Sequence, residues 1–139
     1  MIRLLFAVTL LVAGIGHASA KTLVADVDLS TQRLTIIYKG EPLAEWKVST
    51  GRAGYRTPTG TFRPMRMYRE YFSKEYDGAP MPNAVFYDGG YAIHGSYEIG
   101  SLGAPASHGC IRLHPADAEK FFDLVLTVGA ENTEISIRR

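Results

Sequence analysis

Ser107-His108-Gly109-Cys110-Ile111-Arg112-Leu113 contains the only cysteine of the 139-residue chain, with a glycine directly before it. A thiol beside glycine, in a loop that runs toward a helix, can have backbone N–H groups around it that stabilise an oxyanion as it forms. Exported proteins usually pair their cysteines in disulfides. A single cysteine is therefore either without a role, part of an intermolecular disulfide, or a thiol that takes part in chemistry. The residues around Cys110 favour a thiol that takes part in chemistry.

One clear helical pattern follows this loop. Pro115 suits the first helical position, and Asp117 and Glu119 fall near the start, where carboxylates interact favourably with the helix dipole. Apolar residues recur on one face: Ala118, Phe121, Phe122 and Val125. Gly129 suits the helix end, and the alternation of residues 133–137 predicts a final strand. The sequence therefore predicts one short helix between the cysteine loop and a strand.

Short alternating segments separated by Gly, Pro, Ser or Asp dominate the chain before the cysteine, which predicts a β-rich fold. The expected strands are residues 22–28, 33–38, 44–49 and 59–62, and an expected hairpin pairs 85–87 with 91–93. Asp88-Gly89-Gly90 suits the turn of this hairpin because glycine accepts positive φ angles, and His94 then ends a strand. Between Arg63 and Asn83 the pattern weakens, which predicts a long loop or flap over a site.

The first twenty residues are typical of a secretory signal peptide. Arg3 supplies positive charge, residues 4–15 are apolar, and Ala18-Ser19-Ala20 is a small-x-small cleavage site. This apolar run is shorter than the roughly 20 residues of a membrane-spanning helix. We therefore expect export to the periplasm and a mature chain of residues 21–139 that forms one domain. A formal net charge of +1, without a cluster of Lys and Arg among aromatic residues, argues against nucleic acid as a partner.

Two histidines are near enough in the sequence to deprotonate Cys110. His108 is two residues away, and His94 ends the predicted hairpin, which can pack across the loop. The local pattern does not choose between them. A zinc ion held by His94, His108, Cys110 and His114 is the rival interpretation, but zinc signatures use compact ligand pairs, so we expect no metal. His114 is expected to be a helix cap or a surface residue.

Four runs of the sequence point to one protein family. They are Tyr91-Ala92-Ile93-His94-Gly95, then residues 107–113 about a dozen residues later, residues 48–51 with 56–62, and residues 27–34. The first two resemble the catalytic signature of L,D-transpeptidases of the YkuD-like, ErfK/YbiS type. The third is similar to the substrate-side loop of that family, and the fourth to its opening strands. The resemblance covers essentially the whole mature chain, and it implies a mainly β fold, a mixed β-sandwich with one short helix after the cysteine loop.

Carried over by position, the resemblance makes Cys110 the nucleophile, His94 the base, and the backbone carbonyl of Gly95 the group that orients the imidazole. The backbone N–H groups of Gly109 and Cys110, with His108 as a further contributor, would form the oxyanion hole. Substrate contacts are expected from Ser107, Thr57, Thr59 and Arg112. The wider family often has asparagine where this chain has Arg112, a difference typical of the Gram-negative-type branch. A guanidinium there can hold a stem-peptide carboxylate in a bidentate pair.

The implied substrates are peptidoglycan stem peptides. Cys110 would attack the carbonyl on the L-centre of the diamino acid in a tetrapeptide stem, release the terminal D-alanine and keep the acyl group as a thioester. A second stem would then accept the acyl group to give a 3-3 cross-link, or an outer-membrane or wall-anchored protein would accept it. No cofactor is implied. Two alternatives stay open: a cysteine hydrolase or amidase that trims stems, and a wall-binding or metal-binding module without thiol chemistry.

Overall fold

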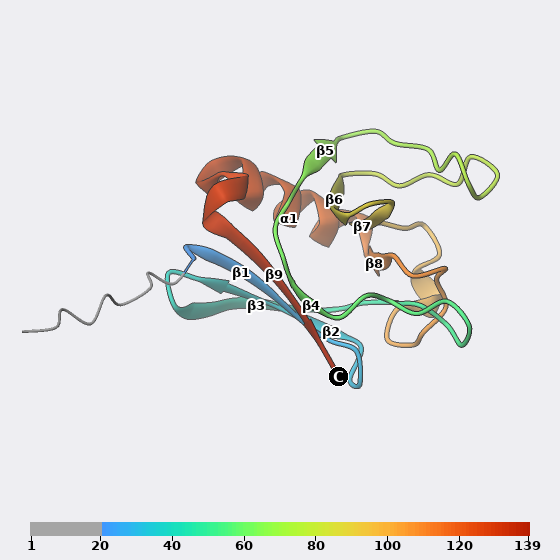
Figure 1. Cartoon of the computed structure of the whole chain (residues 1–139), viewed down its shortest axis with the longest axis horizontal. Coiled ribbons are helices and arrows are strands. Elements are labelled where there is room, and N and C mark those ends of the chain that lie inside the picture. The colour runs from blue at the N-terminus through green and yellow to red at the C-terminus, as the bar shows by residue number, and fades with distance from the viewer. Residues whose placement is uncertain (1–20) are drawn as a thin grey trace, which may run out of the picture.

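The computed structural model describes residues 21–139, and the predicted signal peptide, residues 1–20, lies outside them. Within the described residues, nine strands form two sheets (Figure 1). Sheet A has the order β3-β2-β1-β9-β4 and consists of β1 (Leu23–Asp28), β2 (Arg33–Tyr38), β3 (Glu41–Lys47), β4 (Gly60–Phe62) and β9 (Thr133–Arg138). Sheet B has the order β5-β6-β7-β8 and consists of β5 (Arg66–Tyr68), β6 (Ala84–Asp88), β7 (Tyr91–Gly95) and β8 (Ile111–Leu113). Each sheet contains one parallel pair, so the predicted mixed, mainly β fold is confirmed.

The central strands of sheet A come from segments in which buried and partly exposed residues alternate. Every second side chain of β1 and of β9 is buried, and the two strands run parallel with Ala25 opposite Ile135. The turn from β1 to β2 is closed by the Asp28 carboxylate, which accepts hydrogen bonds from the backbone N–H groups of Ser30 and Thr31. The strands predicted at residues 22–28, 33–38 and 59–62 therefore form within one residue of the expected bounds. The strand predicted at 44–49 is instead β3, Glu41–Lys47, and none of its residues is fully buried.

Sheet B contains the predicted hairpin and two strands that the sequence did not indicate. The hairpin is β6–β7, and Gly89 in its turn has a φ of 51°. The unpredicted strands are β5, inside the segment expected to be a loop, and β8, directly after Cys110. Each has only three residues, too few to show a period of two. Both exist because the hairpin offers its two edges for pairing, β5 to β6 and β8 to β7.

The predicted helix is α1 (Pro115–Val128), and it ends at Gly129, whose φ is 91°. His114 caps its start: the ring Nδ1 accepts a hydrogen bond from the backbone N–H of Ala116 at 3.1 Å, as expected for a cap. The buried face is the predicted one: Ala118, Phe121, Phe122 and Val125. Two short 3-10 helices, η1 (Ile99–Ser101) and η2 (Ala130–Asn132), lie in connections. None of the helices in residues 21–139 is long and apolar enough to cross a membrane.

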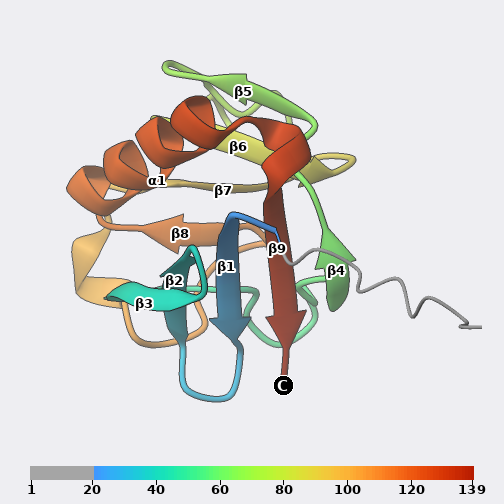
Figure 2. The same cartoon turned by 90° about the vertical axis from the view of Figure 1, so that its left-hand side faces the viewer.

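The two sheets and the helix share one hydrophobic core. The strands of sheet B run across those of sheet A, and α1 contacts both β7 and β1 (Figure 2). Large side chains that are fully buried in this core come from all three parts: Leu34, Ile36, Ile93, Ile111, Leu113, Phe121 and Ile135. Each contributes about 2 kcal/mol of burial free energy. The inner faces of β7 and β8 are thus held by the core, and their outer faces are left for a site.

Candidate active site

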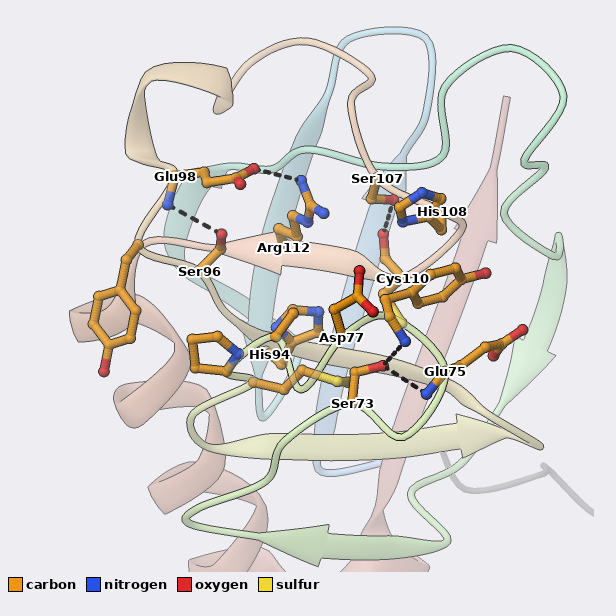
Figure 3. Close-up of a pocket in the computed structure, with 15 residues that line it drawn as sticks. Ser73, Glu75, Asp77, His94, Ser96, Glu98, Ser107, His108, Cys110 and Arg112 are labelled. Atoms are coloured by element: carbon orange, nitrogen blue, oxygen red, sulfur yellow. Dashed lines mark hydrogen bonds and ion pairs between the residues drawn. The ribbon is translucent and has the colours of Figure 1, made fainter.

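The candidate site lies on the outer face of two neighbouring parallel strands. In β7 and β8, Ile93 is opposite Ile111 and His94 is opposite Arg112. Ile93 and Ile111 point into the core, so the period of two places His94 and Arg112 on the other face, together with Cys110. Figure 3 shows these three side chains around one cavity. The pairing therefore brings the lone thiol and a histidine sixteen residues earlier in the chain to one face.

The cavity has a volume of about 590 Å³. One wall is the outer face of β7 and β8, and the opposite wall comes from residues 73–81, within the segment predicted to be a flap. The loop after β7 and the loop before Cys110 close the remaining sides. The polar side chains that line it are Ser73, Glu75, Tyr76, Asp77, His94, Ser96, Tyr97, Glu98, Ser107, His108 and Arg112.

His94 is buried and oriented by its neighbour. Its Nδ1 lies 2.6 Å from the backbone carbonyl of Gly95. A carbonyl only accepts hydrogen bonds, so Nδ1 carries the proton and Nε2 keeps its lone pair. Burial lowers the His94 pKa from 6.5 to about 4. Glycine at position 95 avoids crowding, because an added Cβ would lie 3.0 Å from Cγ of Pro82 and 3.2 Å from Cα of Pro115, and these neighbours would have to shift. The imidazole is thus a neutral base in a fixed tautomer at neutral pH.

Acid is expected to destabilise the folded protein through His94. Between pH 6.5 and about 4 the unfolded chain binds a proton that the folded imidazole excludes, so the free energy of unfolding falls as pH falls. The full effect is about 3 kcal/mol. Urea unfolding from pH 7 to pH 4 should show a steeper fall for the wild type than for His94→Gln. Equal pH dependence in the two proteins would contradict a buried neutral imidazole.

Cys110 is half-buried, and its thiol is protonated at rest. Burial raises the Cys110 pKa, while the backbone N–H of Ala92 and the charge of Arg112 oppose that rise. Its Sγ makes a weak contact with the backbone carbonyl of Gly90 at 3.8 Å. Within residues 21–139 no hydrogen bond joins Sγ to His94. The resting site is therefore a neutral thiol beside a neutral imidazole, and the thiol must leave Gly90 before its proton can move to His94.

Ser107 organises the loop that carries the thiol. Its hydroxyl donates to the carbonyl of Cys110 at 2.6 Å (Figure 3). The same oxygen accepts a hydrogen bond from the backbone N–H of Gly109 at 3.0 Å. This changes two expectations. The Ser107 hydroxyl uses its one donor hydrogen within the loop, so it has none to donate to a substrate. The Gly109 N–H is already bonded to the Ser107 oxygen, so it is not free for an oxyanion. The backbone N–H groups of His108 and Cys110 have no acceptor among the described residues.

Thr57 sets the direction of the Cys110 N–H. The Thr57 side chain is buried, and its hydroxyl accepts from the N–H of Gly51 and donates to the carbonyl of Gly109, both at 2.9 Å. The peptide bond between Gly109 and Cys110 is trans, so its N–H points opposite to its carbonyl. Because Thr57 holds that carbonyl, the Cys110 N–H points away from Thr57. Thr57 is therefore a positioning residue in this structure.

Thr57 and Thr59, the two threonines expected to contact substrate, lie outside this cavity. Neither residue lines it: Thr57 is buried beneath the cysteine loop, and Thr59 is exposed just before β4. The resemblance had placed both in a substrate-side loop. The segment that contains Thr57 instead holds the cysteine loop in place, through the hydrogen bond of Thr57 to Gly109 and the backbone hydrogen bond from the N–H of Arg52 to the carbonyl of Ser107 at 3.0 Å.

His108 lines the cavity between two aromatic rings. Tyr76 stacks on it with ring centroids 4.0 Å apart and planes at 7°, and Tyr55 meets it edge-on at 4.8 Å. Tyr76 belongs to the flap segment, so this stack joins the flap to the cysteine loop. His114 is absent from the cavity because it caps α1. Among residues 21–139, no group of three or more His, Cys, Asp or Glu side chains is placed to hold a metal ion.

Arg112 is paired inside the cavity. Its Nη1 donates to Oε2 of Glu98 at 3.1 Å. The pattern of the sequence gives no reason to single out Glu98 or Tyr76, since an acidic or aromatic residue in a loop follows no period. The one available signal was the proximity of Glu98 to His94, four residues earlier, just beyond the end of β7.

The profile of the YkuD family, described as the L,D-transpeptidase catalytic domain, matches residues 22–137. The chain belongs to this family. L,D-transpeptidase 1 of Mycobacterium tuberculosis strain H37Rv is 29% identical over 128 residues, which cover 82% of this chain and 51% of the relative. The chain thus spans about half the length of that L,D-transpeptidase.

Solved L,D-transpeptidase structures share the fold. One from Mycobacterium smegmatis superposes with a TM-score of 0.75 and 25% identity, covering 86% of this chain and 59% of the other. The L,D-transpeptidase LdtMt1 in complex with imipenem gives a TM-score of 0.74 and 26% identity, covering 85% of this chain and 59% of the other. The mixed β-sandwich expected from the resemblance is therefore the fold of this L,D-transpeptidase domain.

Proposed function

We propose that this L,D-transpeptidase domain acylates Cys110 with a peptidoglycan tetrapeptide stem, releases D-alanine and transfers the acyl group to an amine. The observation that carries the proposal is the shared cavity of Cys110 and His94, with the His94 tautomer held by Gly95. Family membership supports the same chemistry. The chain carries both groups that thiol acyl transfer needs, a nucleophile and a base oriented by a third group.

In the first step Sγ of Cys110 attacks the carbonyl on the L-centre of the diamino acid. Nε2 of His94 takes the thiol proton as the S–C bond forms, and the N–H groups of Cys110 and His108 stabilise the oxyanion. The bond to D-alanine then breaks, and His94 returns the proton to the leaving amine. Because thiol and imidazole both start neutral, charge develops only as the transition state is approached.

In the second step an amine attacks the thioester carbonyl and Nε2 of His94 takes a proton from the amine. The acyl–S bond then breaks, and His94 returns that proton to Sγ of Cys110, which restores the thiol. A second stem gives a 3-3 cross-link, and an outer-membrane or wall-anchored protein gives covalent anchoring. Transfer to water makes the same domain a stem-trimming hydrolase. The proposal includes export through residues 1–20 and work in the periplasm, in keeping with the composition of that segment.

The test uses protein recovered from a periplasmic fraction, whose intact mass reports whether residues 1–20 are removed. It is incubated with disaccharide-tetrapeptide stems and, separately, with imipenem, the ligand of the related LdtMt1 structure. We expect D-alanine release, cross-linked dimer and an imipenem adduct, all lost in Cys110→Ala. A tripeptide product without cross-linked dimer indicates a hydrolase, or a transferase whose natural acceptor is a protein. Absence of adduct and turnover in the wild type would refute thioester chemistry and leave a binding module.

A further inference from the structure

The Glu98–Arg112 pair places two opposite charges at one end of the cavity that contains Cys110 (Figure 3). The Arg112 side chain is only 18% exposed, whereas that of Glu98 is 71% exposed. Glu98 is held by its backbone, whose N–H donates to the hydroxyl of Ser96 at 3.2 Å. An ion pair with one exposed partner adds little to stability, so its place in the cavity calls for another role.

Both groups keep hydrogen-bonding capacity. Arg112 has five N–H donors, and the described residues give it one side-chain partner, Oε2 of Glu98. Oε1 of Glu98 has no partner among those residues. A ligand that carries a carboxylate and an ammonium on the same carbon can therefore bind both residues while their own pair persists.

The spacing from the thiol fits such a ligand. Arg112 follows Cys110 by two residues on the same face, a separation of about 7 Å along a strand. In a 2,6-diamino dicarboxylic acid whose L-centre carbonyl lies at Sγ, five bonds of about 1.5 Å lead to the D-centre and span about 6 Å when extended. The D-centre bears the free ammonium and the free carboxylate.

We infer that Glu98 and Arg112 together recognise the zwitterionic D-centre of the donor stem's diamino acid, an inference that rests on the proposed function. Arg112 binds the D-centre carboxylate, and Glu98 binds the ammonium beside it. The terminal carboxylate of D-alanine is a worse fit for Arg112 because it has no ammonium partner and would meet the like charge of Glu98. The pair thus selects stems with a diamino dicarboxylic acid over stems with lysine.

The test measures D-alanine release with hydroxylamine as a fixed acceptor, so that changes to the stem alter only its donor role. Three donors are compared: the unmodified stem, one with the D-centre carboxylate amidated, and one with the D-centre amine acetylated. For the wild type we expect kcat/KM to fall about 10- to 100-fold with each modification, mainly through KM. Compared with the wild type on the same donor, Arg112→Gln should have a lower kcat/KM on the unmodified stem and an unchanged kcat/KM on the stem with the amidated D-centre carboxylate. Glu98→Gln should have a lower kcat/KM than the wild type on the unmodified stem and an unchanged kcat/KM on the stem with the acetylated D-centre amine.

The matched controls are Arg33→Gln and Glu45→Gln, an ion pair in sheet A outside the cavity, which should leave donor selectivity unchanged. Equal losses on all three donors in the cavity variants would show a structural role and overturn the inference. A fourth donor, whose terminal D-alanine carboxylate is amidated, gives the remaining outcome: the inference is also overturned if the loss caused by Arg112→Gln persists on the D-centre-amidated stem and disappears only on this fourth donor. Wild-type imipenem acylation and stem turnover without donor selectivity would refute this inference alone, whereas absence of both refutes the proposed function.

Discussion

Replacing His94 by glutamine is expected to lower kcat/KM for D-alanine release by about 1,000-fold, within the range of general acid–base catalysis. The imidazole is neutral at pH 7 because burial lowers its pKa, and the Gly95 carbonyl leaves Nε2 as the free acceptor. Glutamine fills the space but takes no proton. The Cys110 thiol, whose pKa is raised, then has no base. Stopped-flow measurement of imipenem acylation isolates this first step.

His114→Gln is the matched control for that variant, since His114 caps α1 outside the cavity. It should keep kcat/KM within about twofold and cost about 1 kcal/mol of helix-cap stability. Acylation of His94→Gln at a rate within tenfold of the wild type would reject His94 as the base. His108, the other histidine of the cavity, would then be the candidate to replace next.

Replacing Thr57 by valine is expected to lower kcat 10- to 100-fold while KM changes little. The hydroxyl holds the Gly109 carbonyl and thereby directs the Cys110 N–H. Loss of one oxyanion donor costs about 100- to 1,000-fold, and misalignment should cost less. The variant also leaves the Gly51 N–H and the Gly109 carbonyl without their buried partner, which destabilises the fold by about 1–3 kcal/mol.

Thr57→Ser separates positioning from stability because it restores the hydroxyl without the methyl group. We expect it to recover most of kcat, and urea unfolding of both variants gives the stability change independently. If Thr57→Val loses stability but keeps the wild-type kcat under folding conditions, Thr57 has a purely structural role. A large rise in KM with unchanged kcat would instead return Thr57 to substrate binding.

The local sequence predicted those helices and strands that are long enough to show a hydrophobic period. The six-residue strands β1 and β9 alternate over their full length and β2 over its first four residues, and α1 has a proline start, an apolar face and a glycine end. The three-residue strands β5 and β8 carry no readable period and form only because the β6–β7 hairpin offers its edges. Their prediction fails for a physical reason: their hydrogen-bond partners are remote in the sequence.

The sequence by itself determined the candidate nucleophile, since one cysteine stands beside glycine in a family signature, and the resemblance pointed to His94 as the candidate base and to the carbonyl of Gly95. Only the tertiary structure decided what the other polar groups do. The Gly109 N–H is taken by Ser107, Thr57 supports the cysteine loop, and Glu98 pairs with Arg112. The physical reason is that the role of a hydrogen-bond donor or acceptor depends on which partner lies within bonding distance of it in the folded chain. Thr57 and Gly109 are 52 residues apart, so only packing brings them together.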